Sequence, residues 1–144
     1  MFDEKKMIIL IDDDSICNSV NQLLIKKEFD HELAIQAFDN PSEALEFLTD
    51  SIKSKVFEKI LVLLDINMPG MTGWELLKEY GLLEKNETEV DIFILSSSIN
   101  QEDMDKAADD SNVIGFMSKP ISNENVRKLY KGMNWDIFPP MMVS

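Results

Sequence analysis

Polar residues that could carry chemistry stand directly after apolar runs of the sequence. One run ends in Asp12-Asp13-Asp14, and another, residues 60–64, ends in a single acid, Asp65. Two later runs end in Ser96-Ser97-Ser98 and in Ser118-Lys119-Pro120. If the runs are neighbouring strands of an open α/β sheet, their carboxyl ends line the crevice where such sheets bind ligands. The spacing therefore predicts one pocket with several carboxylates, a hydroxyl and an ammonium group.

This set of groups favours phosphoryl transfer. Asp12, Asp13 and Asp65 would repel one another in a partly buried pocket, and one would hold a proton unless a cation were bound. Oxygen ligands without His or Cys select a hard ion such as Mg²⁺ or Mn²⁺. Lys119 and the Ser96 hydroxyl could contact phosphoryl oxygens, so the pocket predicts transfer of a phosphoryl group onto Asp65.

Two neighbouring residues extend this prediction, and simpler interpretations exist for some of the others. Asn67 stands where its backbone carbonyl could complete the metal coordination, and a cis Lys119–Pro120 bond would direct the lysine into the pocket. Asp14 is expected to cap the following helix. An acid before Met-Pro-Gly can be simple turn chemistry, and Ser96 could be a mere strand terminus. A cap explains one of three consecutive acids, so metal binding is our interpretation of Asp12 and Asp13.

The elements that must position these residues alternate along the chain. Three of the five apolar runs are nearly continuous, which is typical of strands covered on both faces of a parallel sheet. Helical patterns lie between the runs, and this alternation predicts right-handed βαβ crossovers and a doubly wound α/β fold. The expected strands are residues 7–11, 32–38, 60–64, 91–95 and 112–117.

The predicted helices carry apolar faces and start signals. Asn40-Pro41 begins the second helix, with an N-cap and a proline in the first turn, and Gly73 opens the third. The fourth and fifth are expected at 100–108 and 122–131. In the first helix we expect one stripe to face the sheet, with its lysine extending to solvent. That stripe consists of Ile16, Val20, Leu23, Leu24 and Lys27.

Composition limits the class of protein. The 144 residues suit one domain, and 27 acidic against 14 basic side chains give a net charge of −13, which disfavours nucleic-acid binding. No apolar run reaches the ~20 residues of a membrane span, and the start lacks a signal peptide. Cys17 is the only cysteine, so no internal disulfide forms. We expect a cytoplasmic protein without membrane contact.

Four motifs together resemble the receiver domain of two-component response regulators. The match covers residues 6–131, and the motif after the third strand is the most specific. The resemblance implies a flavodoxin-like (βα)5 fold with strand order 2-1-3-4-5. The motifs are ILIDDD (9–14), LVLLDINMPGMTGWELL (61–77), IFILSSS (92–98) and GFMSKP (115–120).

The resemblance also implies a role for each matching residue. Asp65 would accept a phosphoryl group from a phosphohistidine of a sensor kinase, and Lys119 would contact that group. Asp13 and Asp65 would bind Mg²⁺ directly, Asp12 through water and Asn67 through its carbonyl. The switch residues would be Ser96, which moves toward the new oxyanion, and Phe116, which follows it. Asn67 and Ser98 would tune dephosphorylation.

The expected protein is a single-domain signalling receiver rather than an enzyme acting on a separate substrate. Residues 132–144 are expected to be an irregular or docked tail without an effector domain. Output would then pass through contact with an unidentified protein or through a phosphotransfer histidine. Two alternatives remain: a degenerate receiver that only binds partners, and a haloacid-dehalogenase-type phosphatase using Asp12 and Asp14. Trp74 and His31 are expected to be a helix-face and a surface residue.

Overall fold

A computed structural model describes residues 5–28, 33–83, 88–97, 100–119 and 121–127. Five parallel strands form one sheet in the order β2-β1-β3-β4-β5, which confirms the predicted fold and strand order. The strands are β1 (Lys6–Ile11), β2 (Ala34–Phe38), β3 (Lys59–Asp65), β4 (Glu89–Ser96) and β5 (Val113–Ser118). The helices are α1 (Ser15–Glu28), α2 (Pro41–Ser54), α3 (Gly73–Gly81) and α4 (Gln101–Asp109), followed by helical residues 123–127.

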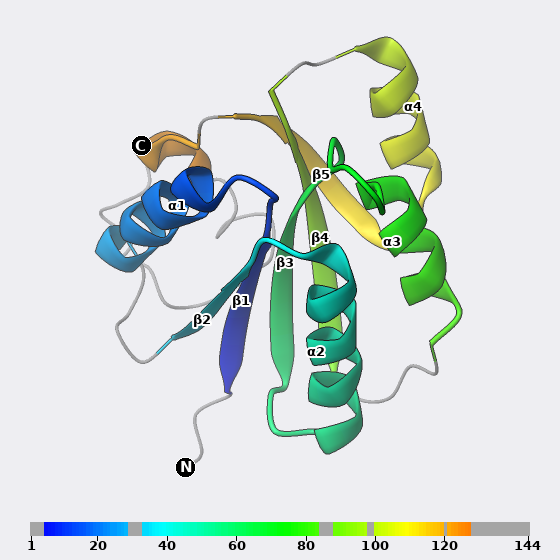
Figure 1. Ribbon diagram of the computed structural model, residues 1–144. Coiled ribbons are helices and arrows are strands. Elements are labelled where there is room, and N and C mark those ends of the chain that lie inside the picture. Colours follow the sequence, from blue (N-terminus) through cyan, green and yellow to red (C-terminus); the bar gives the residue numbers. More distant parts are fainter. Residues whose placement is uncertain (1–4, 29–32, 84–87, 98–99, 120, 128–144) are drawn as a thin grey trace.

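The central strands are buried on both faces, as their continuous apolar runs predicted. Alternate side chains of β1 and β3 enter two separate clusters because successive side chains of a strand point to opposite faces. Ile9 and Val62 belong to a larger cluster, which α2 and α3 cover. Ile8 and Leu61 belong to a smaller one, with Ile25 of α1 and Val126. Helices therefore lie on both sides of the sheet (Figure 1).

Local capping explains where several helices begin. The Asn40 side chain accepts hydrogen bonds from the amides of Ser42 and Glu43, so α2 begins where the sequence predicted. Thr72 and Glu75 form a reciprocal capping box at the start of α3. Asn100 accepts from the Asp103 amide and caps α4. Each cap satisfies amide groups that have no partner within their own helix.

The predicted inner face of α1 is wrong for Ile16, Val20 and Leu23, whereas Leu24 packs against the smaller core cluster as expected. Ile16 is 74% exposed and Leu23 64% exposed, and Val20 is exposed as well. The face toward the sheet carries Asn18, Asn21 and Ile25 instead. The first half of α1 lies against the polar ends of β1 and β2, where the Asn18 amide donates to two backbone oxygens. An apolar side chain at position 18 would remove this donor from both oxygens, although the Phe38 oxygen would keep its bond from the Asp12 amide.

Candidate functional site

The turn after β3 fixes the position of Asp65. Ile66 and Met68 return into the core, and Gly70 takes a positive φ of 86°, which favours glycine. Gly73 then brings the start of α3 against the strand end, and its amide donates to the Ile66 oxygen at 3.1 Å. A Cβ on Gly73 would lie 2.6 Å from the Ile66 Cα and 2.8 Å from the backbone oxygen of Asp65. The sequence after Asp65 therefore builds a close-packed support for it.

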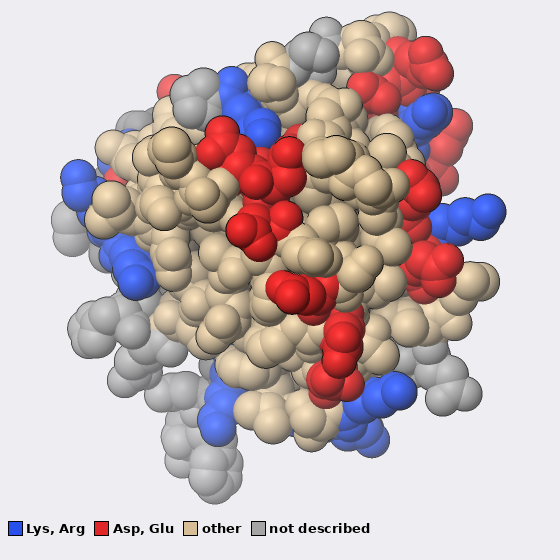
Figure 2. Space-filling view, viewed as in Figure 1, with Lys and Arg blue, Asp and Glu red and all other residues tan. Residues whose placement is uncertain are grey.

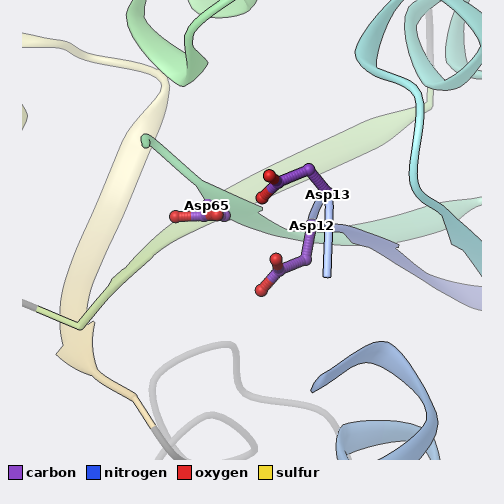
Figure 3. A group of neighbouring side chains, drawn as sticks. All are labelled: Asp12, Asp13 and Asp65. Atoms are coloured by element: carbon purple, nitrogen blue, oxygen red, sulfur yellow. The ribbon is translucent and has the colours of Figure 1, made fainter. Parts of the chain in front are cut away.

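Three carboxylates meet at the ends of β1 and β3. Asp12 and Asp13 follow β1, Asp65 ends β3, and one carboxylate oxygen from each lies within 4.8 Å of the others (Figure 3). Asp12 and Asp65 are each 3% exposed, whereas Asp13 is open to solvent. The predicted group of carboxylates is therefore present, and Asp13 leaves it open to solvent.

Lys119 reaches this group from the end of β5. Its Nζ donates to Asp12 Oδ2 at 2.7 Å and lies 3.4 Å from Asp65 Oδ2. The backbone amide of Lys119 donates to the Ser96 oxygen at 2.8 Å, which ties the end of β5 to that of β4. One ammonium group is thus held between two buried carboxylates.

The electrostatics distinguish the two buried acids. Burial raises the pKa of Asp65 to about 6, the charge of Asp12 adds to the rise, and the Asn67 amide and Lys119 oppose it. Burial acts in the same direction on Asp12, but hydrogen bonds from Lys119 and from the Asp14 amide leave its pKa lowered. Burial opposes the charge of Lys119, yet the hydrogen bond to Asp12 and both carboxylates raise its pKa. Asp12 and Lys119 are therefore a charged pair, and Asp65 is the carboxylate that lacks full compensation.

Ser96 and Asn67 complete the site beside Asp65. Ser96 is fully buried at the end of β4, one residue after Leu95, which pairs with Asp65 in the sheet. The Asn67 amide nitrogen lies 3.4 Å from Ser96 Oγ, and the Asn67 backbone amide donates to Asp65 Oδ1 at 3.1 Å. Asn67 is exposed and bridges the acid and the hydroxyl.

The residues present fit a divalent cation. The donors are carboxylate oxygens, which suit Mg²⁺ or Mn²⁺, and the uncompensated charge of Asp65 would be neutralised by such an ion. Acidic side chains also form a band across the face that Figure 2 shows, so the surrounding field attracts cations.

Comparison with known proteins identifies the family. The sequence model for the response regulator receiver domain matches residues 8–131. The chain belongs to this family. The two-component response regulator ARR17 of Arabidopsis thaliana is 31% identical over 134 residues, 88% of this chain and 84% of that protein. The chain spans only 20% of another Arabidopsis relative, ARR13, at 24% identity over 86% of this chain.

Solved structures agree with the family assignment. A two-component response regulator from Cytophaga hutchinsonii superposes with a TM-score of 0.76 at 29% identity, covering 92% of this chain and 99% of that one.

Family membership argues against the phosphatase alternative. So does Asp14, whose carboxylate accepts from the amides of Ile16 and Cys17 and caps α1, as predicted. No helix in the described part of this receiver domain is long and apolar enough to cross a membrane.

The receiver site contains most of the residues that the sequence predicted. Asp12, Asp13, Asp65 and Lys119 are together, and Asn67 and Ser96 adjoin them. Phe116 is half-buried on β5 and packs against the larger core cluster. Ser98, Pro120 and the cis bond expected before Pro120, His31 and the tail 132–144 lie outside the described residues.

Sequence reasoning missed Asn18 as a residue that supports the receiver site. Asn18 is buried, and its side-chain nitrogen donates to the backbone oxygen of Asp12 at 2.9 Å and to that of Phe38 at 3.1 Å. These bonds hold the backbone that presents Asp12. The available signal was an asparagine at position i+4 from the capping acid Asp14, one turn into the helix.

Proposed function

We propose that this receiver domain accepts a phosphoryl group on Asp65 from a phosphohistidine, in a reaction that depends on a divalent cation. The observation that carries the proposal is the placement of Asp65. It is a buried acid with a raised pKa, beside Asp13, Asp12 and Lys119, at the carboxyl end of a parallel sheet. Family membership supports a histidine kinase or a phosphotransfer protein as the donor.

The chemistry follows from the contacts. A carboxylate oxygen of Asp65 attacks phosphorus, the phosphorus–nitrogen bond to the donor histidine breaks, and the imidazole nitrogen keeps the electron pair. Lys119 already faces the Asp65 oxygen and would neutralise charge on the transferred group. Asp12, Asp13 and Asp65 would hold Mg²⁺, with the Asn67 carbonyl as a further ligand, and the ion would neutralise phosphoryl oxygens.

The remaining residues would report and limit the phosphorylated state. The Ser96 hydroxyl would bond a phosphoryl oxygen, and Phe116, which packs nearby in the core, would follow it. Asn67 and Ser98 would tune hydrolysis of the aspartyl phosphate. The changed surface would bind a downstream protein or the phosphoryl group would pass to another histidine, so the domain acts in signalling and not on a separate substrate.

The test is phosphorylation by acetyl phosphate with Mg²⁺, followed by intact-mass analysis. We expect the wild type to gain one phosphoryl group, and Asp65→Asn and Asp13→Asn to gain none or far less. Asp14→Asn is the matched control, because Asp14 is also exposed in the same loop, and asparagine caps helices equally well.

Two results would contradict the proposal. Labelling of Asp65→Asn would place the phosphoryl group elsewhere. A wild type that neither acetyl phosphate nor a phosphorylated histidine donor can label would leave only the degenerate, partner-binding alternative.

A further inference from the structure

Helix α4 is attached to the receiver domain by little apolar contact. Of its nine residues only Ala107 is buried, and Met104 is 42% exposed. Its first turn is organised by a reciprocal pair: the Asp103 amide donates to Asn100 Oδ1 at 2.9 Å, and Asn100 Nδ2 donates to Asp103 Oδ2 at 3.0 Å. This pair orders the helix start but does not fasten it to the rest of the domain.

Helix α4 packs beside β5, and a side chain from α3 adds a polar attachment. Trp74 Nε1 donates to Asp103 Oδ1 at 3.3 Å, and Lys106 Nζ lies 5.7 Å from the centroid of the Trp74 ring. The indole itself packs against the larger core cluster. A half-buried tryptophan on a well-anchored helix thus contacts the first two turns of α4 by a hydrogen bond and a cation–π interaction. We name Trp74, Asp103 and Lys106 the Trp74 cluster.

The cluster lies at the point where a change at the phosphorylation site would reach α4. Ser96 ends β4, and the α4 cap Asn100 follows it four residues later in the sequence. Before phosphorylation, Ser96 Oγ lies 3.4 Å from the Asn67 amide nitrogen. If Ser96 shifts to bond a phosphoryl oxygen, it pulls on the chain that leads to the cap, and Asp103 is three residues beyond that cap. The bond from Trp74 resists this displacement.

We infer that the Trp74 cluster holds α4 in its unphosphorylated position and thereby opposes phosphorylation of Asp65. The effect on phosphorylation of Asp65 rests on the proposed function, whereas the attachment of α4 by Trp74 does not. Trp74 is a positioning residue, since it touches neither Asp65 nor the cation ligands in the described contacts. A receiver with two α4 positions shifts toward the phosphorylated form when contacts specific to the other position are removed.

The first measurement is amide hydrogen exchange of wild type and Trp74→Phe without a phosphoryl donor. We expect residues 101–109 to exchange about two- to tenfold faster in the variant, the range for losing one hydrogen bond. Residues 41–54 of α2 should be unchanged. Glu102→Gln, an exposed substitution on α4 that leaves Trp74 untouched, is the control and should leave α4 exchange as in wild type. Unchanged α4 exchange in Trp74→Phe would overturn the inference.

The second measurement is the rate of labelling by acetyl phosphate and Mg²⁺. Trp74→Phe should be labelled faster, by at most the same two- to tenfold factor, because the opposing contact is weakened. Faster α4 exchange with an unchanged labelling rate would overturn the coupling. A wild type that takes no label refutes the proposed function, while the exchange experiment still decides whether Trp74 holds α4.

A second pair of variants guards against misfolding of Trp74→Phe. Lys106→Gln removes the cation over the ring at an exposed position, but it also breaks the ion pair with Glu102 at 3.7 Å. Glu102→Gln breaks that same pair without touching Trp74. We expect Lys106→Gln to raise both rates and Glu102→Gln to raise neither; equal effects of the two would overturn the role of the Trp74 ring.

Discussion

Helices α3 and α4 are both nine residues long, and they are attached to the sheet in opposite ways. Helix α3 buries Gly73, Leu76, Leu77 and Tyr80, whereas α4 buries one alanine. Helix α3 is the next element of the chain after Asp65, and α4 is the next after Ser96. The difference indicates that the acid lies on a firmly packed part of the domain, while the residue that would respond to it leads to a helix that can move.

The largest expected effect is on α3. Leu76→Ala removes a fully buried side chain from the larger core cluster and should lower the free energy of unfolding by about 2–5 kcal/mol, through lost burial and a cavity. Denaturant unfolding measures this. The matched change on α4, Met104→Ala, should alter stability by no more than about 0.5 kcal/mol, because Met104 is 42% exposed. Similar losses in the two variants would remove the distinction between the helices.

The next effect concerns the free-energy cost of burying the charged Asp65 carboxylate at the start of the turn that leads to α3. Burial raises the pKa of Asp65 from 3.8 to about 6, so the folded protein holds a proton on it over a pH range in which the unfolded chain does not. Its contribution to stability is therefore present below pH 3.8 and is lost as the pH rises through 6. At pH 7 without metal, Asp65→Asn should stabilise the fold by at most about 3 kcal/mol.

The pH dependence is the check on this prediction. The gain from Asp65→Asn, measured by unfolding in EDTA, should be largest above the raised pKa of about 6 and should shrink as the pH approaches 3.8. Added Mg²⁺ should stabilise wild type and not the variant, because asparagine lacks the negative charge of the carboxylate that would bind the ion. A gain that does not depend on pH would show that burial of the charged carboxylate is not its cause.

A smaller effect should follow from Gly73→Ala at the start of α3. The new Cβ would lie 2.6 Å from the Ile66 Cα, so the backbone must shift, and we expect a loss of about 1–3 kcal/mol. Gly81→Ala at the other end of α3 is the control, since nothing lies within 4 Å of its Cβ position. Thermal unfolding compares the two variants. Equal stability would mean that the turn after Asp65 is not close-packed.

The sequence predicted the site better than it predicted the helix surfaces. Asp12, Asp65 and Lys119 each follow an apolar run, and in a parallel sheet all such positions converge at one edge, so spacing was sufficient. Most of the predicted inner face of α1 was wrong because periodicity does not show what a helix lies against. Asn18 faces inward since it meets the carbonyls of Asp12 and Phe38, and that contact exists only in the folded chain.

The contact between α3 and α4 was also beyond the sequence. Trp74 and Asp103 are 29 residues apart on separate helices, and the pattern within each helix carries no information about the other. Trp74 does lie on a face of α3, as predicted, but the sequence did not indicate its contact with Asp103. Its partner depends on how the two helices are placed by β4 and β5.

The smallest expected effects compare the caps of the two helices. Thr72 caps α3 and Asn100 caps α4, and loss of either side chain should cost about 0.5–2 kcal/mol of local helix stability. In Thr72→Ala the loss should appear in global unfolding, because α3 unfolds with the core. In Asn100→Ala it should appear mainly as faster amide exchange in residues 101–109, with little change in global stability, since α4 can open alone.

Asn40→Ala on α2 is the reference for a cap on a helix that buries four residues. Its effect on global unfolding should match that of Thr72→Ala. If Asn100→Ala lowered global stability as much as these two variants, α4 would unfold together with the core despite burying only Ala107. The helix would then be bound to the domain chiefly by polar contacts such as those from Trp74, and weakening those contacts should lower global stability as well. The cap experiment therefore decides whether α4 is a locally movable element or part of the cooperative fold.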